Sequence, residues 1–74
     1  MKKIQIHTEF IKLDQFMKLT SLVTSGSEAK ALILEGYLFV NNQPCIQRGK
    51  KLRIGDIIEF KGQKWIINDE NYKN

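Results

Sequence analysis

The sequence predicts a small α+β domain in which two packed helices lie against a small, mostly antiparallel sheet. Three observations predict this class. Apolar residues alternate with polar ones near the N-terminus, recur at helical spacing in two segments of the first half, and alternate again after Gly36. With 74 residues the chain has room for one small core, so residues 1–74 are expected to form a single domain.

A strand and then a helix are expected in the N-terminal part of the chain. Ile4 and Ile6 alternate with polar residues, which indicates a short strand with one buried face. Apolar residues then recur at helical spacing from Leu13, and a helix is predicted over residues 13–19. Asp14 is expected to cap this helix or to pair near its start.

The second helix is delimited by signals at both ends. Ser25 can act as the N-cap, and Glu28, three residues later, is expected to complete a capping box. Gly36 is suited to the C′ position, where the backbone turns left-handed. The face expected to be buried consists of Ala29, Leu32 and Ile33.

After Gly36 the apolar pattern has the period of a strand. Leu38 and Val40 are expected to face the core, and Tyr37 and Phe39 the other side. Phe39 is expected to cover a second small core under a hairpin at residues 61–65. For Tyr37, this covering role and stacking on an unpaired base both stay open.

Turns and a hairpin account for the rest of the chain. Asn41-Asn42 is a turn dipeptide, because asparagine tolerates positive φ. Gly55-Asp56 turns the chain into a strand at residues 57–60, which is expected to pair with a strand at residues 65–67. Residues 68–74 are polar and are expected to form a frayed tail. The residues expected to be largely buried are Leu13, Phe16, Ala29, Leu32, Ile33, Leu38, Val40, Ile58 and Trp65.

Positive charge is concentrated in one segment. The chain has a formal net charge of +4 and a pI near 9.4. No acidic residue lies between Glu35 and Asp56, and this gap holds Arg48, Lys50, Lys51 and Arg53. A locally basic face favours a polyanionic partner, although such a run can also be a solvated loop.

Several functional classes are disfavoured by composition. Cys45 is the only cysteine, so no internal disulfide can form, and a reducing cytoplasm is the expected compartment. With His7 as the only histidine, a zinc site of Cys and His ligands is not expected, and neither a metal nor a cofactor is predicted. No apolar run is long enough to span a bilayer or to act as a secretory signal, so a soluble protein with no membrane partner is predicted.

An ordered series of short motifs identifies a family resemblance. The series consists of Lys12-Leu13-Asp14, Ser27-Glu28-Ala29-Lys30 with Ile33, Gly36-Tyr37-Leu38-Phe39-Val40-Asn41-Asn42, and Gly55-Asp56-Ile57-Ile58. Over about residues 11–60 the chain resembles the S4 RNA-binding domain, also called the alpha-L RNA-binding motif. Within that superfamily it is most similar to the stand-alone bacterial proteins of the YaaA type.

The chain departs from the family pattern at two places. Many members carry Ser-Arg before the second helix, whereas this chain has Ser25-Gly26, so the resemblance implies a weaker phosphate contact at that loop. The turn residue after Asn41 is Asn42 instead of glycine. Many relatives also carry an attached pseudouridine synthase, methyltransferase or aminoacyl-tRNA synthetase, and no such segment is recognised here.

Residues of three kinds are candidates for contact with RNA. They are cations, hydroxyl donors near the start of the second helix, and residues of the strand and turn that follow it. The full set is Lys12, Lys18, Ser25, Ser27, Lys30, Tyr37, Asn41, Arg48, Lys50, Lys51 and Arg53. For Ser25, simple helix capping and phosphate contact are equally compatible with the sequence.

The function predicted from these observations is non-catalytic binding of structured RNA by a monomeric protein. The resemblance implies ribosomal RNA or a ribosome-assembly particle as the first target and tRNA as the next. One alternative is a protein-interaction adaptor with Leu34, Tyr37 and Phe39 as its face, and a less favoured one is a DNA-binding module. An enzyme is disfavoured because the sequence has no nucleophile–base pair, metal cluster or phosphate-binding glycine loop.

Overall fold

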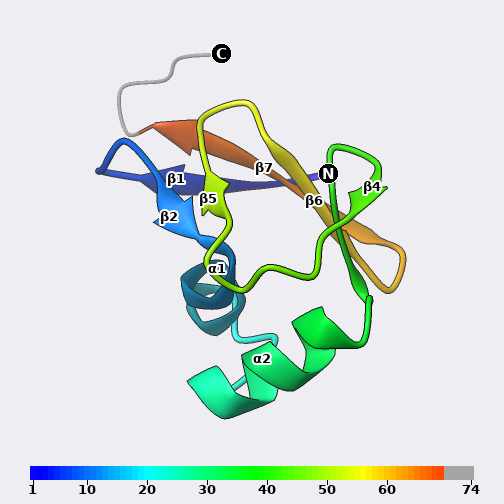
Figure 1. Ribbon diagram of the computed structural model, residues 1–74. Coiled ribbons are helices and arrows are strands. Elements are labelled where there is room, and N and C mark those ends of the chain that lie inside the picture. The colour runs from blue at the N-terminus through cyan, green and yellow to red at the C-terminus, as the bar shows by residue number, and fades with distance from the viewer. Residues whose placement is uncertain (70–74) are drawn as a thin grey trace.

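The computed structural model describes residues 1–69, and the last five positions of the expected polar tail lie outside the described residues. Two helices and seven strands form within this range (Figure 1). In chain order they are β1 (Lys2–Ile6), β2 (Ile11–Lys12), α1 (Leu13–Leu19), α2 (Gly26–Leu34), β3 (Leu38–Val40), β4 (Gln43–Pro44), β5 (Lys51–Leu52), β6 (Ile57–Phe60) and β7 (Gln63–Asp69).

The strands form one five-stranded sheet and one short two-stranded ladder. The order in the larger sheet is β1-β7-β6-β3-β4, with β1 parallel to β7 and the other neighbours antiparallel. The ladder pairs β2 with β5. Figure 1 shows both helices on one side of the sheet, with β2 and β5 beside the start of α1. The predicted α+β class, with packed helices and a mostly antiparallel sheet, is confirmed.

A single cluster of buried side chains joins the helices to the sheet. Phe16 of α1 meets Trp65 of β7 edge to face, with ring centroids 5.5 Å apart. Of the nine residues expected to be buried, eight are buried and Leu32 is only half-buried. The predicted phases of α1, α2, β3 and β6 are therefore correct.

The N-terminal capping of α2 differs from the expectation in one detail. The Ser25 hydroxyl accepts a hydrogen bond from the backbone N–H of Glu28, as predicted. The Glu28 carboxylate, however, accepts from the N–H of Thr24 at 2.9 Å and not from that of Ser25. The reciprocal bond is thus shifted by one residue, and the carboxylate ties the preceding loop to the first turn of the helix.

Gly36 ends α2 in a Schellman motif. Its φ is +88°, its N–H donates to the Ile33 carbonyl, and the N–H of Tyr37 donates to the Leu32 carbonyl. A Cβ at this position would meet no atom within 4 Å, so only backbone conformation opposes a side chain there. We expect Gly36→Ala to lower the free energy of unfolding by about 1–2 kcal/mol, measured by urea titration.

Gly26 supplies the matched control for that measurement. It is the first residue of α2, has no positive φ, and also has open space around its Cβ position. We expect Gly26→Ala to leave stability unchanged or to raise it by up to about 1 kcal/mol, because alanine has the better helix propensity. Equal losses from both substitutions would contradict the assignment of Gly36 as a left-handed cap.

Two expectations about the later part of the chain are wrong. Phe39 keeps 36% of its surface exposed and does not belong to the buried cluster, so it covers no second core. Asn68 and Asp69 are not frayed but form the last residues of β7, opposite Gln5 and Ile6 of β1. The parallel pairing with β1 gives the backbones of these two residues hydrogen-bond partners. Their polar side chains gave no indication of a strand.

Candidate nucleic-acid interface

Five cations from two distant segments meet around the β2–β5 ladder. We call the set the basic surface: Lys12, Arg48, Lys50, Lys51 and Arg53. In the ladder, Ile11 is opposite the buried Leu52, and Lys12 is opposite Lys51. Two like charges at directly paired positions repel each other. An anion bound between them would relieve that repulsion.

The N-terminus of α1 holds the basic loop in place through backbone hydrogen bonds. The N–H of Leu13 donates to the Lys50 carbonyl at 2.9 Å, and the N–H of Asp14 donates to the Arg48 carbonyl at 3.1 Å. The Asp14 carboxylate accepts from the N–H of Gln15 at 2.8 Å, so Asp14 engages a donor of the first turn near the helix start, although the N-cap itself is Lys12. These free donors of the first turn are thus used within the protein, and they fix the backbone from which the cations project.

Phe10 supports two members of the basic surface and was missed by the sequence reasoning. The Lys51 ammonium lies 4.8 Å and the Arg53 guanidinium carbon 5.6 Å from the centre of its ring. Both distances are within the range of cation–π attraction. No local signal could have identified Phe10, because its two cationic neighbours come near it only through the β2–β5 pairing.

The basic surface is not neutralised by the protein itself. All five side chains are exposed. Within residues 1–69, none of them forms an ion pair with a carboxylate. The nearest acidic group in the chain after Arg53 is Asp56, and it accepts from the backbone N–H of Arg53 instead of its side chain. The positive potential of the surface is therefore available to an external polyanion.

The remaining helix candidates are exposed, and Lys18 lines the same hollow as Phe10 and Ile11. Lys18, Ser27 and Lys30 are all on the surface. Ser25 uses its hydroxyl oxygen to accept from the Glu28 N–H, and the Glu28 carboxylate lies in the same turn. The start of α2 is therefore less attractive to a phosphate than the resemblance implied.

Tyr37 and Asn41 occupy different kinds of position. Tyr37 is 47% exposed, with the Lys61 ammonium 5.9 Å from the centre of its ring. Asn41, with φ of +51°, uses both ends of its amide internally. The nitrogen donates to the Asp56 carboxylate and the oxygen accepts from the Ile57 N–H. Asn41 thus joins the β3–β4 turn to the turn before β6.

Other site types find no support in the described residues. Within residues 1–69 no group of three or more His, Cys, Asp or Glu side chains lies close enough to hold a metal ion. No helix in that range has the length and apolar character needed to cross a membrane.

Two comparisons with known proteins agree with the motif series. A sequence model of the S4 domain matches residues 4–68. The chain is also 44% identical over 59 residues to a Bacillus subtilis (strain 168) protein named "Probable ribosome maturation protein RlbA". That alignment covers 80% of this chain and 83% of the relative. The chain therefore belongs to the S4 domain family.

Proposed function

We propose that this protein is a non-catalytic RNA-binding protein that holds structured RNA through its phosphates. The observation that carries the proposal is the basic surface, five exposed cations that have no acidic partner in the described residues. Lysine and arginine side chains that project into solvent make charge contacts with phosphates, and counterion release then supplies the affinity. Base readout would be modest, because phosphate contacts carry no sequence information.

The proposed target is ribosomal RNA or a ribosome-assembly particle, with tRNA as the next candidate. The similarity to a protein named for ribosome maturation supports this choice. In this proposal the chain is a cytoplasmic monomer and residues 1–74 form one S4-like unit of the alpha-L type. Lys18, Lys30 and the hydroxyls of Ser25 and Ser27 would extend the contact along the helices, and Tyr37 would stack on an unpaired base.

A protein-interaction adaptor is the second candidate, and one observation favours it. Leu34, Tyr37 and Phe39 remain 55%, 47% and 36% exposed. These apolar side chains lie on α2, just after it, and on β3. A contact driven by their burial would depend little on salt.

DNA binding is the weakest of the three. Beyond its cap, α2 presents Lys30 but also Glu28 and Glu35, which gives few groups for reading a major groove. The small number of donors on this helix argues against a recognition helix.

Competition binding at several salt concentrations tests the proposal. A fluorescent ribosomal RNA fragment would be displaced by unlabelled structured RNA or by duplex DNA of equal phosphate count. We expect RNA to compete at least about tenfold better than DNA, and log K to fall linearly with log salt. Equal competition by DNA would favour the DNA-binding alternative. Absence of RNA binding at low salt would leave the adaptor as the better reading.

A further inference from the structure

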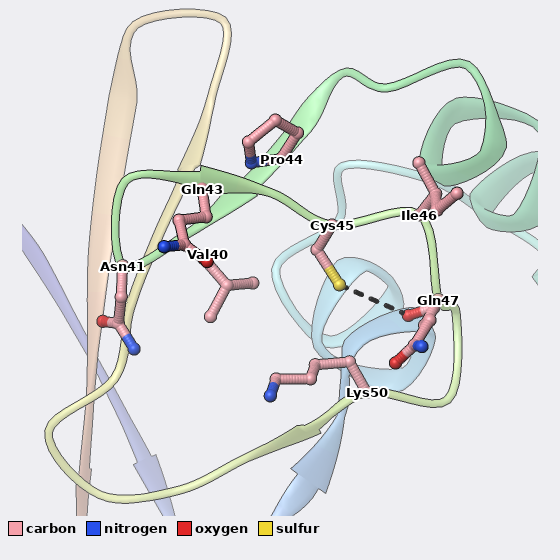
Figure 2. Close-up of a pocket in the computed structure, with 8 residues that line it drawn as sticks. All are labelled: Val40, Asn41, Gln43, Pro44, Cys45, Ile46, Gln47 and Lys50. Carbon is pink, nitrogen blue, oxygen red and sulfur yellow. Dashed lines mark hydrogen bonds between the residues drawn. The ribbon is translucent and has the colours of Figure 1, made fainter.

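A hollow of about 450 Å³ lies between the β3–β4 turn and the start of the basic loop (Figure 2). This volume is within the range of small-molecule sites. Lys50 belongs both to the hollow and to the basic surface, so the two are continuous. The lining residues are Val40, Asn41, Gln43, Pro44, Cys45, Ile46, Gln47 and Lys50.

Hydrogen bonds hold the walls of the hollow in place. The N–H of Cys45 donates to the Leu38 carbonyl at 2.9 Å, and the N–H of Lys50 donates to the Gln47 carbonyl at 3.1 Å. The Cys45 thiol also reaches the Gln47 carbonyl, with sulfur and oxygen 3.7 Å apart. On the other side, the amide of Asn41 fastens the turn. The hollow is thus formed before any ligand arrives, which lowers the entropic cost of binding.

The polar groups at the rim are free to meet a ligand. Among residues 1–69, the side-chain amides of Gln43 and Gln47 have no hydrogen-bond partner, and neither does the Lys50 ammonium. Figure 2 shows the Lys50 side chain extending from the loop toward Val40 and Asn41. Each amide offers both donors and an acceptor, whereas Lys50 offers only donors and a positive charge.

This combination matches the chemistry of a nucleotide. The edge of a base carries donors and acceptors that amide side chains can pair with, and its faces are apolar enough to lie against Val40 and Cys45. The attached phosphate is an anion suited to Lys50. A base inside a paired helix is not available for such contacts, so only an unpaired one fits.

We propose that the hollow receives one unpaired nucleotide of the bound RNA, with its base between Gln43 and Gln47 and its phosphate at Lys50. The inference rests on the proposed RNA-binding function and adds to it a site of base recognition.

Alkylation of Cys45 tests the inference on the native chain, because this is the only cysteine. The alkylation rate would be measured for three samples. These are the protein alone, the protein with an RNA hairpin that has one unpaired nucleotide in its stem, and the protein with the same hairpin fully paired. With RNA at about ten times its Kd, we expect the first RNA to slow alkylation roughly tenfold, since about one chain in eleven stays free. The paired hairpin is expected to slow it less than about twofold at matched occupancy.

The double variant Gln43→Ala/Gln47→Ala then tests base recognition. For the native chain we expect at least about tenfold preference between the best and worst base at the unpaired position, and for the variant less than about twofold. Gln63→Ala, at the far β6–β7 turn, is the control and should keep the native preference. Equal protection of Cys45 by both hairpins, or an unchanged preference in the double variant, would overturn the inference while RNA binding stands. If neither hairpin bound, the proposed function would be overturned, and this inference with it.

Discussion

Replacement of Lys50 and Lys51 by alanine is expected to weaken binding of structured RNA by about 10- to 100-fold at moderate salt. Both side chains project from the loop that α1 holds through its first backbone N–H groups, and Lys51 also faces Lys12 across the ladder. Neither pairs with an acid in the described residues, so the substitutions remove charge that is available to the RNA phosphates.

The salt dependence gives the more specific measurement. Each lost phosphate contact should reduce the slope of log K against log salt by about 0.7 on single strands, and by somewhat more on duplex regions. The double variant should therefore lower the slope by roughly one to two units. The loss should be similar for unrelated RNAs, because phosphates carry no sequence information.

A charge-matched control is available at the opposite end of the sheet. Lys2 donates to the side chain of Gln63, and Lys64 lies beside them at the β6–β7 turn. The variant Lys2→Ala/Lys64→Ala makes the same change in net charge without touching the basic surface, and should leave the slope nearly unchanged. If the Lys50/Lys51 variant also kept the native slope, the basic run would be a solvated loop, and the adaptor alternative would gain support.

Local signals explain why the helices could be predicted to the residue. The cap at Ser25 and the glycine at position 36 act through neighbours within one helical turn, so the ends of α2 can be predicted from the sequence. The turn at Asn41-Asn42 is equally local, and both residues do have positive φ. Alternation correctly placed Leu38 and Val40 in the core.

Contacts between distant segments were not predictable in the same way. The β2–β5 ladder has only two residues in each strand, too few for any alternation to show. The parallel β1–β7 pair joins the two ends of the described chain, and it gives Asn68 a place in the sheet that a polar side chain does not suggest. The position of Phe10 beside Lys51 and Arg53 also depends on such a pairing.

Only part of the candidate site could be predicted, because the rest also depends on contacts between distant segments. The sequence identified the cations, because charge is a property of composition. It could not show that Lys12 lies opposite Lys51 or that the amide of Asn41 is engaged internally. Whether the cations of the helices and those of the basic surface bind one RNA remains a prediction for the salt measurements.

Replacement of Phe16 by alanine is expected to lower the free energy of unfolding by about 3–5 kcal/mol. Phe16 is fully buried, and its ring meets Trp65 at an interplanar angle of 83°, so it connects α1 to β7. A chain of this size is expected to have a total stability of only about 4–11 kcal/mol, so the variant should lose a large part of it and unfold at a clearly lower urea concentration. Urea titration followed by circular dichroism would measure the loss independently of any change in Trp65 fluorescence.

Phe39→Ala is the matched control, since it removes the same ring from a position that is 36% exposed on the outer face of β3. It should cost about 1 kcal/mol or less, because it loses only cross-strand contact with its neighbours. The Phe16 variant should also recover stability when RNA is added, by about 2.7 kcal/mol at one hundred times the Kd, because RNA binds the folded state. Comparable losses in the two phenylalanine variants would contradict the single core described here. Stabilisation by RNA in the Phe16 variant would show that α1 still presents the basic loop once refolded, and so would link the core to the binding surface that it supports.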